Sequence, residues 1–343
     1  MEEINVKTQM AKIRGFEKGF MATHLINIGD KLGIFEALNQ DKDGLTLQEM
    51  ASRLGLHGPY LKTWCQTMYH FEVLDSDEHG RFKLQPFLDE IIGDKNHFRN
   101  YMANISMDVD LIGRGMYEAP EYFRTGKALE AYDSPETSKV AYGTTKNIYL
   151  AFLFMILPKN EHLKEMLDKG IKFLDIGCGD GTLITRLAQS FPNSRFVGVC
   201  PDIYGIELAE AAISQQGLGG RVSVMHRGGE EIEYKDEFDV VNMVVTLHEI
   251  FPAVREKAVG NAYEALKPGG CLMVLDFPYP ARIEDFRTPI YDYGILDQCY
   301  EMVIGTEHLS SQEQDALLGK TGFKNLQRMS IGKGMFDFIT ATK

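Results

Sequence analysis

The sequence lacks an excess of basic residues. Its 343 residues include 36 Lys and Arg against 49 Asp and Glu, which gives a formal net charge of -13. Phosphate backbones are bound mainly by Lys and Arg, so this balance argues against a nucleic-acid partner and suits a small or cationic ligand better. Acidic surfaces also keep proteins in solution, so charge alone carries little weight.

Long apolar runs are also missing. The longest, residues 149–157, is shorter than the roughly 18 residues of a membrane span, and residues 1–7 have neither the basic start nor the apolar core of a signal peptide. We therefore expect no membrane partner and a cytoplasmic protein.

Cysteine is scarce, and its pattern is uninformative. The five cysteines are odd in number, widely spaced and form no C-x-x-C pair: Cys65, Cys178, Cys200, Cys271 and Cys299. Neither a disulfide framework nor a metal site is indicated, which fits a reducing cytosol.

What is present, 44% hydrophobic residues over this length, suggests two domains. Apolar residues at helical spacing over 19–38 predict one or two helices. A helix capped by Thr46, a turn at 55–59, a helix over 60–71 and a hairpin with strands at 71–74 and 81–84 follow in winged-helix layout. Residues 46–90 hold four basic and seven acidic residues, so a structural or dimerising module is favoured over DNA binding.

Residues 100–168 are predicted to be helical, with turns at Gly113, Gly115, Pro120 and Gly126. After Gly170, strands and helices alternate, which predicts a mostly parallel sheet covered on both faces. We place strands at 172–176, 195–199, 222–226, 238–244 and 271–276, helices at 183–189, 206–215 and 253–266, and two closing strands at 323–329 and 335–342.

Residues 172–181 form an apolar strand that leads into a glycine turn and a helix. Glycines there let the backbone approach a ligand at the carboxyl end of the strand. An acid, Asp175, lies inside the strand, while the third-glycine spacing of dinucleotide sites and the lysine of a P-loop are missing. A nicotinamide cofactor and a nucleotide triphosphate are therefore disfavoured.

Residues 174–181 resemble the first motif of class I S-adenosylmethionine-dependent methyltransferases, and residues 261–270 look like the helix and turn before their fifth strand. With the N-terminal module, the similarity narrows to small-molecule O-methyltransferases of the plant caffeate type and their bacterial relatives. The resemblance implies a Rossmann-like, seven-stranded doubly wound α/β sheet at 105–343, with 105–168 as helical linker and acceptor-pocket region. It also implies a smaller, mainly helical winged-helix-like domain at 1–104 that forms a homodimer.

The resemblance assigns S-adenosylmethionine to the glycine turn, the end of the second strand and an acidic segment near the adenine: Asp175, Gly177, Cys178, Gly179, Cys200, Asp202, Gly229 and Glu230. Cys200 stands where the family usually has the acid that binds the ribose. A thiol is a weak hydrogen-bond partner, so Asp202 is favoured for the ribose, although it also suits a helix N-cap.

The resemblance makes His248 the general base, with Asp276 and His308 at the places of two acids that orient it. A capping box at 310–313 sets the register of this comparison, and His308 in place of an acid is a departure from the family. The alternative interpretation of His248 is a polar residue at a strand end without a catalytic role. Many methyltransferases of other chemistry carry a His there.

The expected acceptor is a small hydroxyl compound that is aromatic or otherwise flat and apolar. Its pocket is assigned to aromatic and apolar residues that fit a hydrophobic core equally well, namely Tyr149, Phe152, Phe154, Phe277, Tyr279, Tyr291, Tyr293 and Met302. Alternatives are N-, C- or S-methylation, a relative that binds the cofactor without transferring methyl, and a cofactor-sensing DNA-binding regulator.

Overall fold

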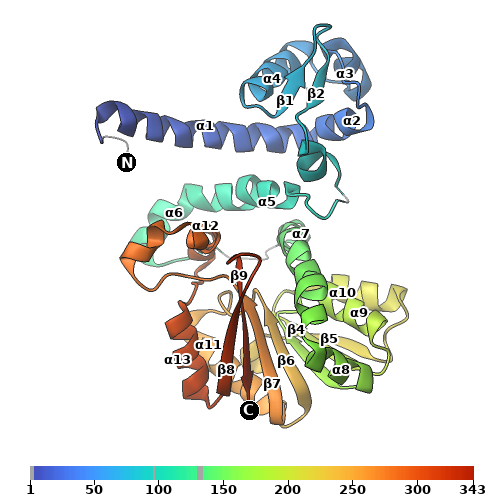
Figure 1. Ribbon diagram of the computed structural model, residues 1–343, viewed down its shortest axis with the longest axis vertical. Helices are drawn as coiled ribbons and strands as arrows, with labels where there is room; N and C mark the ends of the chain where they lie inside the picture. The colour runs from blue at the N-terminus through green and yellow to red at the C-terminus, as the bar shows by residue number, and fades with distance from the viewer. Residues whose placement is uncertain (1–3, 96, 130–133) are drawn as a thin grey trace. The chain divides into compact units, whose positions relative to one another are not determined.

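A computed structural model describes residues 4–95, 97–129 and 134–343. The chain forms two compact units, one ending at Arg114 and one beginning at Gly115. Figure 1 shows the elements of each unit. Residues 130–133, which fall in the predicted linker region, lie outside the described residues.

The first unit is mainly helical. Its elements are α1 (Val6–Lys31), α2 (Ile34–Gln40), α3 (Leu47–Leu54), α4 (Gly58–His70), β1 (Leu74–Ser76), β2 (Phe82–Leu84) and α5 (Met102–Ser106), with π-helical turns at Asp89–Gly93 and Met107–Ile112. The predicted cap is present, since the Thr46 hydroxyl accepts from the Glu49 backbone and the Glu49 carboxylate accepts from the Thr46 backbone. The hydrophobic core of the first unit includes Ile34, Phe35, Met50 and Trp64.

The hairpin is present, but its first strand was predicted too early. Phe71 and Val73 donate backbone hydrogen bonds to Thr67 and Met68, and Glu72 has a φ of 59°, so this segment closes the end of α4. Strand pairing therefore begins only at Leu74, opposite Leu84.

Residues beyond position 104 pack with the first unit. The Asp110 carboxylate accepts from Asn27 (3.2 Å) and forms an ion pair with Lys31 (2.5 Å), both on α1. These contacts explain why the first unit extends to Arg114, whereas the domain boundary was predicted at 104/105.

The second unit contains α6 (Gly113–Thr125), α7 (Pro135–Ala151), α8 (Glu161–Lys169), α9 (Thr182–Ser190), α10 (Ile203–Gln215), α11 (Pro252–Ala265), α12 (Asp292–Ile304) and α13 (Ser311–Thr321). The prediction of turns at Gly113, Gly115 and Pro120 was wrong, because all three lie inside α6. Gly115 packs against Val303, where a larger residue has no room, and Gly126, with a φ of 69°, follows the end of the helix.

The seven strands of this unit form one sheet in the order β5-β4-β3-β6-β7-β9-β8. Their bounds are β3 (Lys172–Ile176), β4 (Arg195–Cys200), β5 (Val222–His226), β6 (Phe238–Val244), β7 (Leu266–Asp276), β8 (Lys324–Ile331) and β9 (Phe336–Thr342). Strands β3 to β7 are parallel, and β9 pairs antiparallel with β7 and β8. The predicted doubly wound sheet is confirmed. The carboxyl ends of β3, β6 and β7 therefore meet at one edge.

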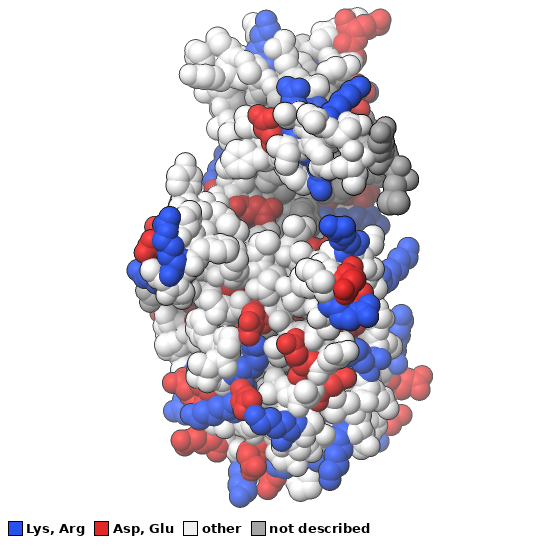
Figure 2. All heavy atoms as spheres, turned by 90° about the vertical axis from the view of Figure 1, so that its left-hand side faces the viewer, with Lys and Arg blue, Asp and Glu red and all other residues white. Residues whose placement is uncertain are grey.

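Helices cover both faces of this sheet (Figure 1). Helices α8, α9 and α10 contribute to the core on one face, and α11 and α13 to the core on the other. Figure 2 shows basic and acidic side chains interspersed over the face that it presents.

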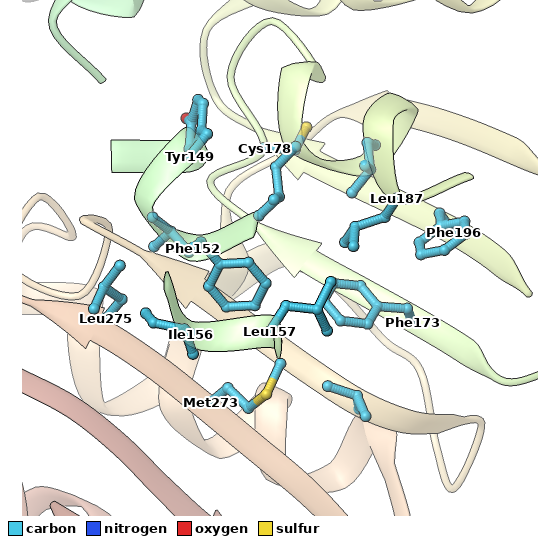
Figure 3. Close-up of a cluster of buried hydrophobic side chains, with 14 of the residues drawn as sticks. Tyr149, Phe152, Ile156, Leu157, Phe173, Cys178, Leu187, Phe196, Met273 and Leu275 are labelled. Carbon is cyan, nitrogen blue, oxygen red and sulfur yellow. The ribbon is translucent and has the colours of Figure 1, made fainter. Parts of the chain in front are cut away.

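The chain between α7 and α8 continues helically through a π-helical turn, Phe152–Ile156, and a 3-10 turn, Leu157–Lys159. In Figure 3 the side chains of Phe152 and Ile156 lie among those of the strands, including Phe173 and Met273. Phe152 is fully buried. This segment is thus part of the sheet's hydrophobic core.

Among the described residues, one helical stretch, Pro135–Lys159, is long and apolar enough to cross a membrane by length and composition, with a mean hydropathy of 1.3. The core helix of a soluble protein passes the same test, and the buried residues of this stretch, such as Phe152, pack on the sheet. The absence of a membrane partner stays a prediction.

We expect Phe152→Ala to lower the free energy of unfolding by about 3–5 kcal/mol, because it removes a ring from a packed core. Phe154, two residues later, is 71% exposed, so Phe154→Ala should change stability by no more than about 0.5 kcal/mol. Urea unfolding of both variants measures the difference. Equal losses for the two would contradict this packing.

Candidate active site

The glycine turn after β3 is a surface where backbone replaces side chains. Gly177, Gly179 and Gly181 have φ values of 79°, 51° and 71°. A Cβ on Gly177 would lie 2.9 Å from Thr246 Cβ, and one on Gly179 would lie 2.6 Å from a ring carbon of Tyr142. Side chains are excluded at both positions, so backbone groups line the turn.

Asp175 lies in β3 just before this turn and is buried. Burial raises the pKa of its carboxyl to about 7, and the hydrogen bond that its Oδ1 accepts from Asn242 Nδ2 (2.7 Å) lowers the pKa only in part. The other polar atom of that amide, Asn242 Oδ1, is buried without a hydrogen-bond partner among the described residues. Two adjacent acceptors thus lie beside the turn, where a cationic group would satisfy them.

The other predicted cofactor residues in this region differ in what their side chains do. The Cys178 side chain belongs to the hydrophobic core (Figure 3). Burial raises the pKa of the Cys200 thiol to about 11, so it stays neutral. Asp202 is the N-cap of α10: its Oδ1 accepts from the Tyr204 backbone (2.9 Å), and its Oδ2 accepts from the Tyr142 hydroxyl.

Gly229 and Glu230 form a 3-10 turn after β5. Gly229 is buried, and a Cβ on it would lie 2.9 Å from Ile176, the last residue of β3. The Asn261 side chain donates to the Gly229 carbonyl (3.1 Å). The structure therefore brings this turn to the same sheet edge as the glycine turn.

His248 follows β6 and is reached from the glycine turn through Thr246. Val245, the residue between the end of β6 and Thr246, has a φ of 47°. Its N–H donates to the Leu275 carbonyl on β7 (2.7 Å). A β-branched residue in the left-handed region is strained, and such strain is typical of functional sites.

His248 and Asp276 form a buried pair at the ends of β6 and β7. The imidazole Nδ1 lies 2.5 Å from Asp276 Oδ1, which also accepts from the Phe277 backbone (2.8 Å). The His308 ring stacks on that of His248 at a centroid distance of 4.2 Å. The three residues predicted to be catalytic are thus brought together, and all are at most 5% exposed.

Two acids that the sequence analysis did not single out complete this cluster from α12. Asp297 Oδ2 lies 2.9 Å from His308 Nε2 and 3.7 Å from His248 Nε2. Glu301 Oε1 lies 3.9 Å from His248 Nε2. Their spacing of four residues, which puts both on one helix face, was the only available signal, and it is common on exposed helices.

The charged groups of the cluster shift one another's pKa values. Burial lowers the pKa of His248, but the carboxylates of Asp276, Glu301 and Asp297 outweigh it and raise the pKa to about 10. Burial raises the pKa of Glu301, whereas for Asp276 the contact with His248 outweighs burial and lowers the pKa. An imidazolium is therefore strongly stabilised here.

A pocket of about 560 Å³ adjoins His308. Its lining includes Tyr279, Phe286, Gln298 and Glu313, and Tyr279 stacks on the His308 ring at 5.4 Å. The other residues predicted to line an acceptor pocket do not lie together. Phe277 and Tyr293 pack beside the cluster. Tyr149 and Phe152 belong to the core, and Phe154 is exposed. Tyr291 and Met302 lie at most partly buried at the ends of α12.

Comparisons with known proteins show similarity to methyltransferases. Residues 173–270 match the family described as a methyltransferase domain. The chain is 24% identical over 184 residues to the ubiquinone/menaquinone biosynthesis C-methyltransferase UbiE of Vibrio campbellii, which covers 48% of this chain and 69% of that protein.

Solved structures match over almost the whole chain. The mitomycin 7-O-methyltransferase MmcR has a TM-score of 0.78 at 17% identity and covers 98% of each chain. Human N-acetylserotonin methyltransferase in complex with S-adenosylmethionine has a TM-score of 0.74 at 15% identity, covering 100% of this chain and 99% of the human one. The chain accordingly has the class I S-adenosylmethionine-dependent methyltransferase fold, and residues 173–270 are the part that matches the methyltransferase-domain family.

Proposed function

We propose that this chain transfers a methyl group from S-adenosylmethionine to the hydroxyl of a small, flat, apolar acceptor, with His248 as general base. The observation that carries the proposal is the His248–Asp276 pair, which lies two residues from the Thr246 side chain that packs on Gly177. A proton acceptor is thereby held next to the turn expected to bind the methyl donor.

The residues around the glycine turn fit the donor. S-Adenosylmethionine carries a cationic amino group and a sulfonium, and Asp175 with Asn242 Oδ1 offers buried acceptors that need a cation. The backbone at Gly177, Cys178 and Gly179 can approach it without side-chain obstruction.

The two remaining contacts of the donor fall at the ends of β4 and β5. For the ribose, Asp202 together with the Tyr142 hydroxyl that it binds takes the place of the neutral Cys200 thiol. Gly229 and Glu230 lie where the adenine is expected.

The chain's own groups handle the acceptor proton. As the hydroxyl oxygen bonds to the methyl carbon, the carbon–sulfur bond breaks and its electron pair stays on sulfur, giving S-adenosylhomocysteine. The hydroxyl proton passes to His248 Nε2 when that ring is neutral, and the raised pKa of His248 means that the ring must first lose its own proton. Asp276 fixes the ring through Nδ1 and stabilises the imidazolium that forms, which lowers the cost of deprotonating a phenol.

Carbon is the main alternative to oxygen as the atom that accepts the methyl group. The Vibrio relative is a C-methyltransferase, whereas MmcR is an O-methyltransferase. Oxygen is favoured here because an ordered His–Asp pair suits removal of a hydroxyl proton. Incubation with methyl-labelled S-adenosylmethionine and a metabolite extract, followed by identification of the labelled compound, decides between oxygen, carbon, nitrogen and sulfur.

For the first unit we propose a winged-helix-like dimerisation module in a cytosolic homodimer. The exposed side of α1 carries apolar residues at helical spacing: Val6, Met10, Ile13, Phe16 and Phe20, all at least 57% exposed. Such a seam suits packing against a second helix. The acidic balance of residues 46–90 disfavours the alternative of a DNA-binding regulator, and gel-shift binding abolished by Lys62→Ala would instead support that alternative.

We expect His248→Ala to lower kcat/KM by about 10²- to 10⁴-fold while the affinity for S-adenosylhomocysteine stays within about twofold, because only the base is lost. The measurement uses labelled donor with a panel of simple phenols. His162→Ala, an exposed histidine of the same unit, should leave turnover unchanged. Full turnover in His248→Ala would remove this residue from the mechanism.

We expect the affinity for S-adenosylhomocysteine to depend on Asp175. Because its pKa is about 7 without ligand and a cationic amino group needs the ionised carboxylate, Kd should be constant above pH 7 and rise about tenfold per pH unit below it. Calorimetry measures this Kd over a range of roughly pH 5.5 to 8.5, which extends to both sides of the pKa of Asp175.

Asp175→Asn should weaken binding and abolish this pH dependence, whereas Asp180→Asn, in the same turn, should keep the slope. A Kd that does not change with pH in the unmodified protein would show that Asp175 does not bind the amino group.

We expect the double variant Phe16→Ser, Phe20→Ser to be monomeric. Light scattering should give a mass near 38.7 kDa for this variant and about twice that for the unmodified protein, because two apolar side chains leave the seam. Tyr60→Ser, which changes an exposed residue of α4, should stay dimeric. A monomeric unmodified protein rules the seam out.

A further inference from the structure

The two histidines and two of the acids around His248 have their ligating atoms close together. One ligating atom each from His248, Asp297 and His308 lie within 4.8 Å of one another. His248, Glu249 and Glu301 form a second such group, in which Glu301 Oε1 lies 3.9 Å from His248 Nε2. We propose that these four side chains form a binding site for a divalent transition-metal ion of the zinc class. No cysteine takes part, so the cysteine pattern of the sequence could not reveal it.

The distances suit such an ion. A tetrahedral zinc-class ion about 2.1 Å from each ligand atom holds neighbouring ligand atoms about 3.4 Å apart. Asp297 Oδ2 is 2.9 Å from His308 Nε2 and 3.7 Å from His248 Nε2, on either side of that value. Small side-chain movements are therefore enough to close the site.

Further residues hold the ligands in the required state. Asp276 binds Nδ1 of His248, so Nε2 is the nitrogen that faces Asp297 and Glu301, and an ion would displace the proton from it. The Thr306 hydroxyl donates to Glu301 Oε2, leaving Oε1 for the ion. A carboxylate behind a ligating histidine is the usual support of a metal site.

The charges of the cluster also call for a cation. Asp276, Asp297, Glu301 and Glu249 lie together with two histidines, so four carboxyl groups surround two imidazole rings. The Arg255 guanidinium faces the Glu307 side chain (3.7 Å) and the backbone carbonyls of His248 and Glu307. A divalent ion would neutralise the remaining negative charge.

The ligand set selects the class of metal. Two imidazole nitrogens with two carboxylate oxygens suit Zn²⁺ or Co²⁺, whereas Mg²⁺ and Ca²⁺ prefer all-oxygen sites. His308 also lines the pocket of about 560 Å³, which gives an ion a route to the site.

This inference goes beyond the proposed function, and metal binding can be measured without methyl transfer. The two do meet at one atom, because His248 Nε2 cannot bind an ion and accept a proton at once. The metal-bound form is therefore expected to be inactive in the reaction proposed above.

The test titrates CoCl₂ into the full chain after removal of metals by a chelator, and follows heat and the visible absorption of Co²⁺. We expect one tetrahedral Co²⁺ per chain with micromolar affinity, displaced by Zn²⁺. His308→Gln and Asp297→Asn should each weaken Kd by about 100-fold or more, since each removes a ligand, and Asp276→Asn by about 10- to 100-fold.

Two controls separate this site from other sources of binding. His162→Gln removes an exposed histidine and should not change Kd, and Cys299→Ser removes the exposed thiol on α12 and should not either. X-ray absorption of the Co²⁺-loaded unmodified protein should show nitrogen and oxygen ligands without sulfur, even where a variant fails to fold. No binding, sulfur ligation, or a Kd unaffected by His308→Gln and Asp297→Asn would overturn the proposal.

Discussion

The hydrogen bond between His248 Nδ1 and Asp276 is the interaction on which the rest of the site depends. It joins the carboxyl ends of β6 and β7, which are neighbouring parallel strands in register from Val240 opposite Cys271 to Val244 opposite Leu275. Parallel pairing places both chain ends at one edge, and burial removes competing water. The pair therefore holds the imidazole in one orientation before any ligand arrives.

This constraint extends to the glycine turn through the strained segment at Val245. The left-handed φ of Val245 redirects the chain after β6, so that Thr246 packs on Gly177 while His248 turns to Asp276. The cost of such a conformation is about 1–3 kcal/mol, which packing elsewhere in the unit must offset. A relaxed backbone here would move His248 relative to the glycine turn.

Much of the second unit could be predicted from sequence because its signals are local. The apolar strand, the glycines after it and the capping box at Ser310 each lie within a few residues, and β3, β5 and β6 begin and end where predicted. The π-helical turn at Phe152–Ile156 and the helix through Pro120 could not be predicted, because tertiary packing overrides the local preference there.

The partners that the sequence did not reveal come from distant segments. Tyr142 reaches Asp202 across 60 positions, and Asp297 reaches His248 across about 50, so no spacing rule links them. Tyr142 and Asp202 lie beside the neutral Cys200, and the Asp297 carboxylate lies beside His308.

Two acids of α12 set the charge around His248. Asp297 and Glu301 on α12 place two carboxylates beside the stacked rings of His248 and His308. A base oriented by carboxylates alone can exchange only a proton. Two stacked imidazoles with two carboxylates have the donor atoms of a metal site, so in the functions proposed above a proton and a metal ion would compete for His248.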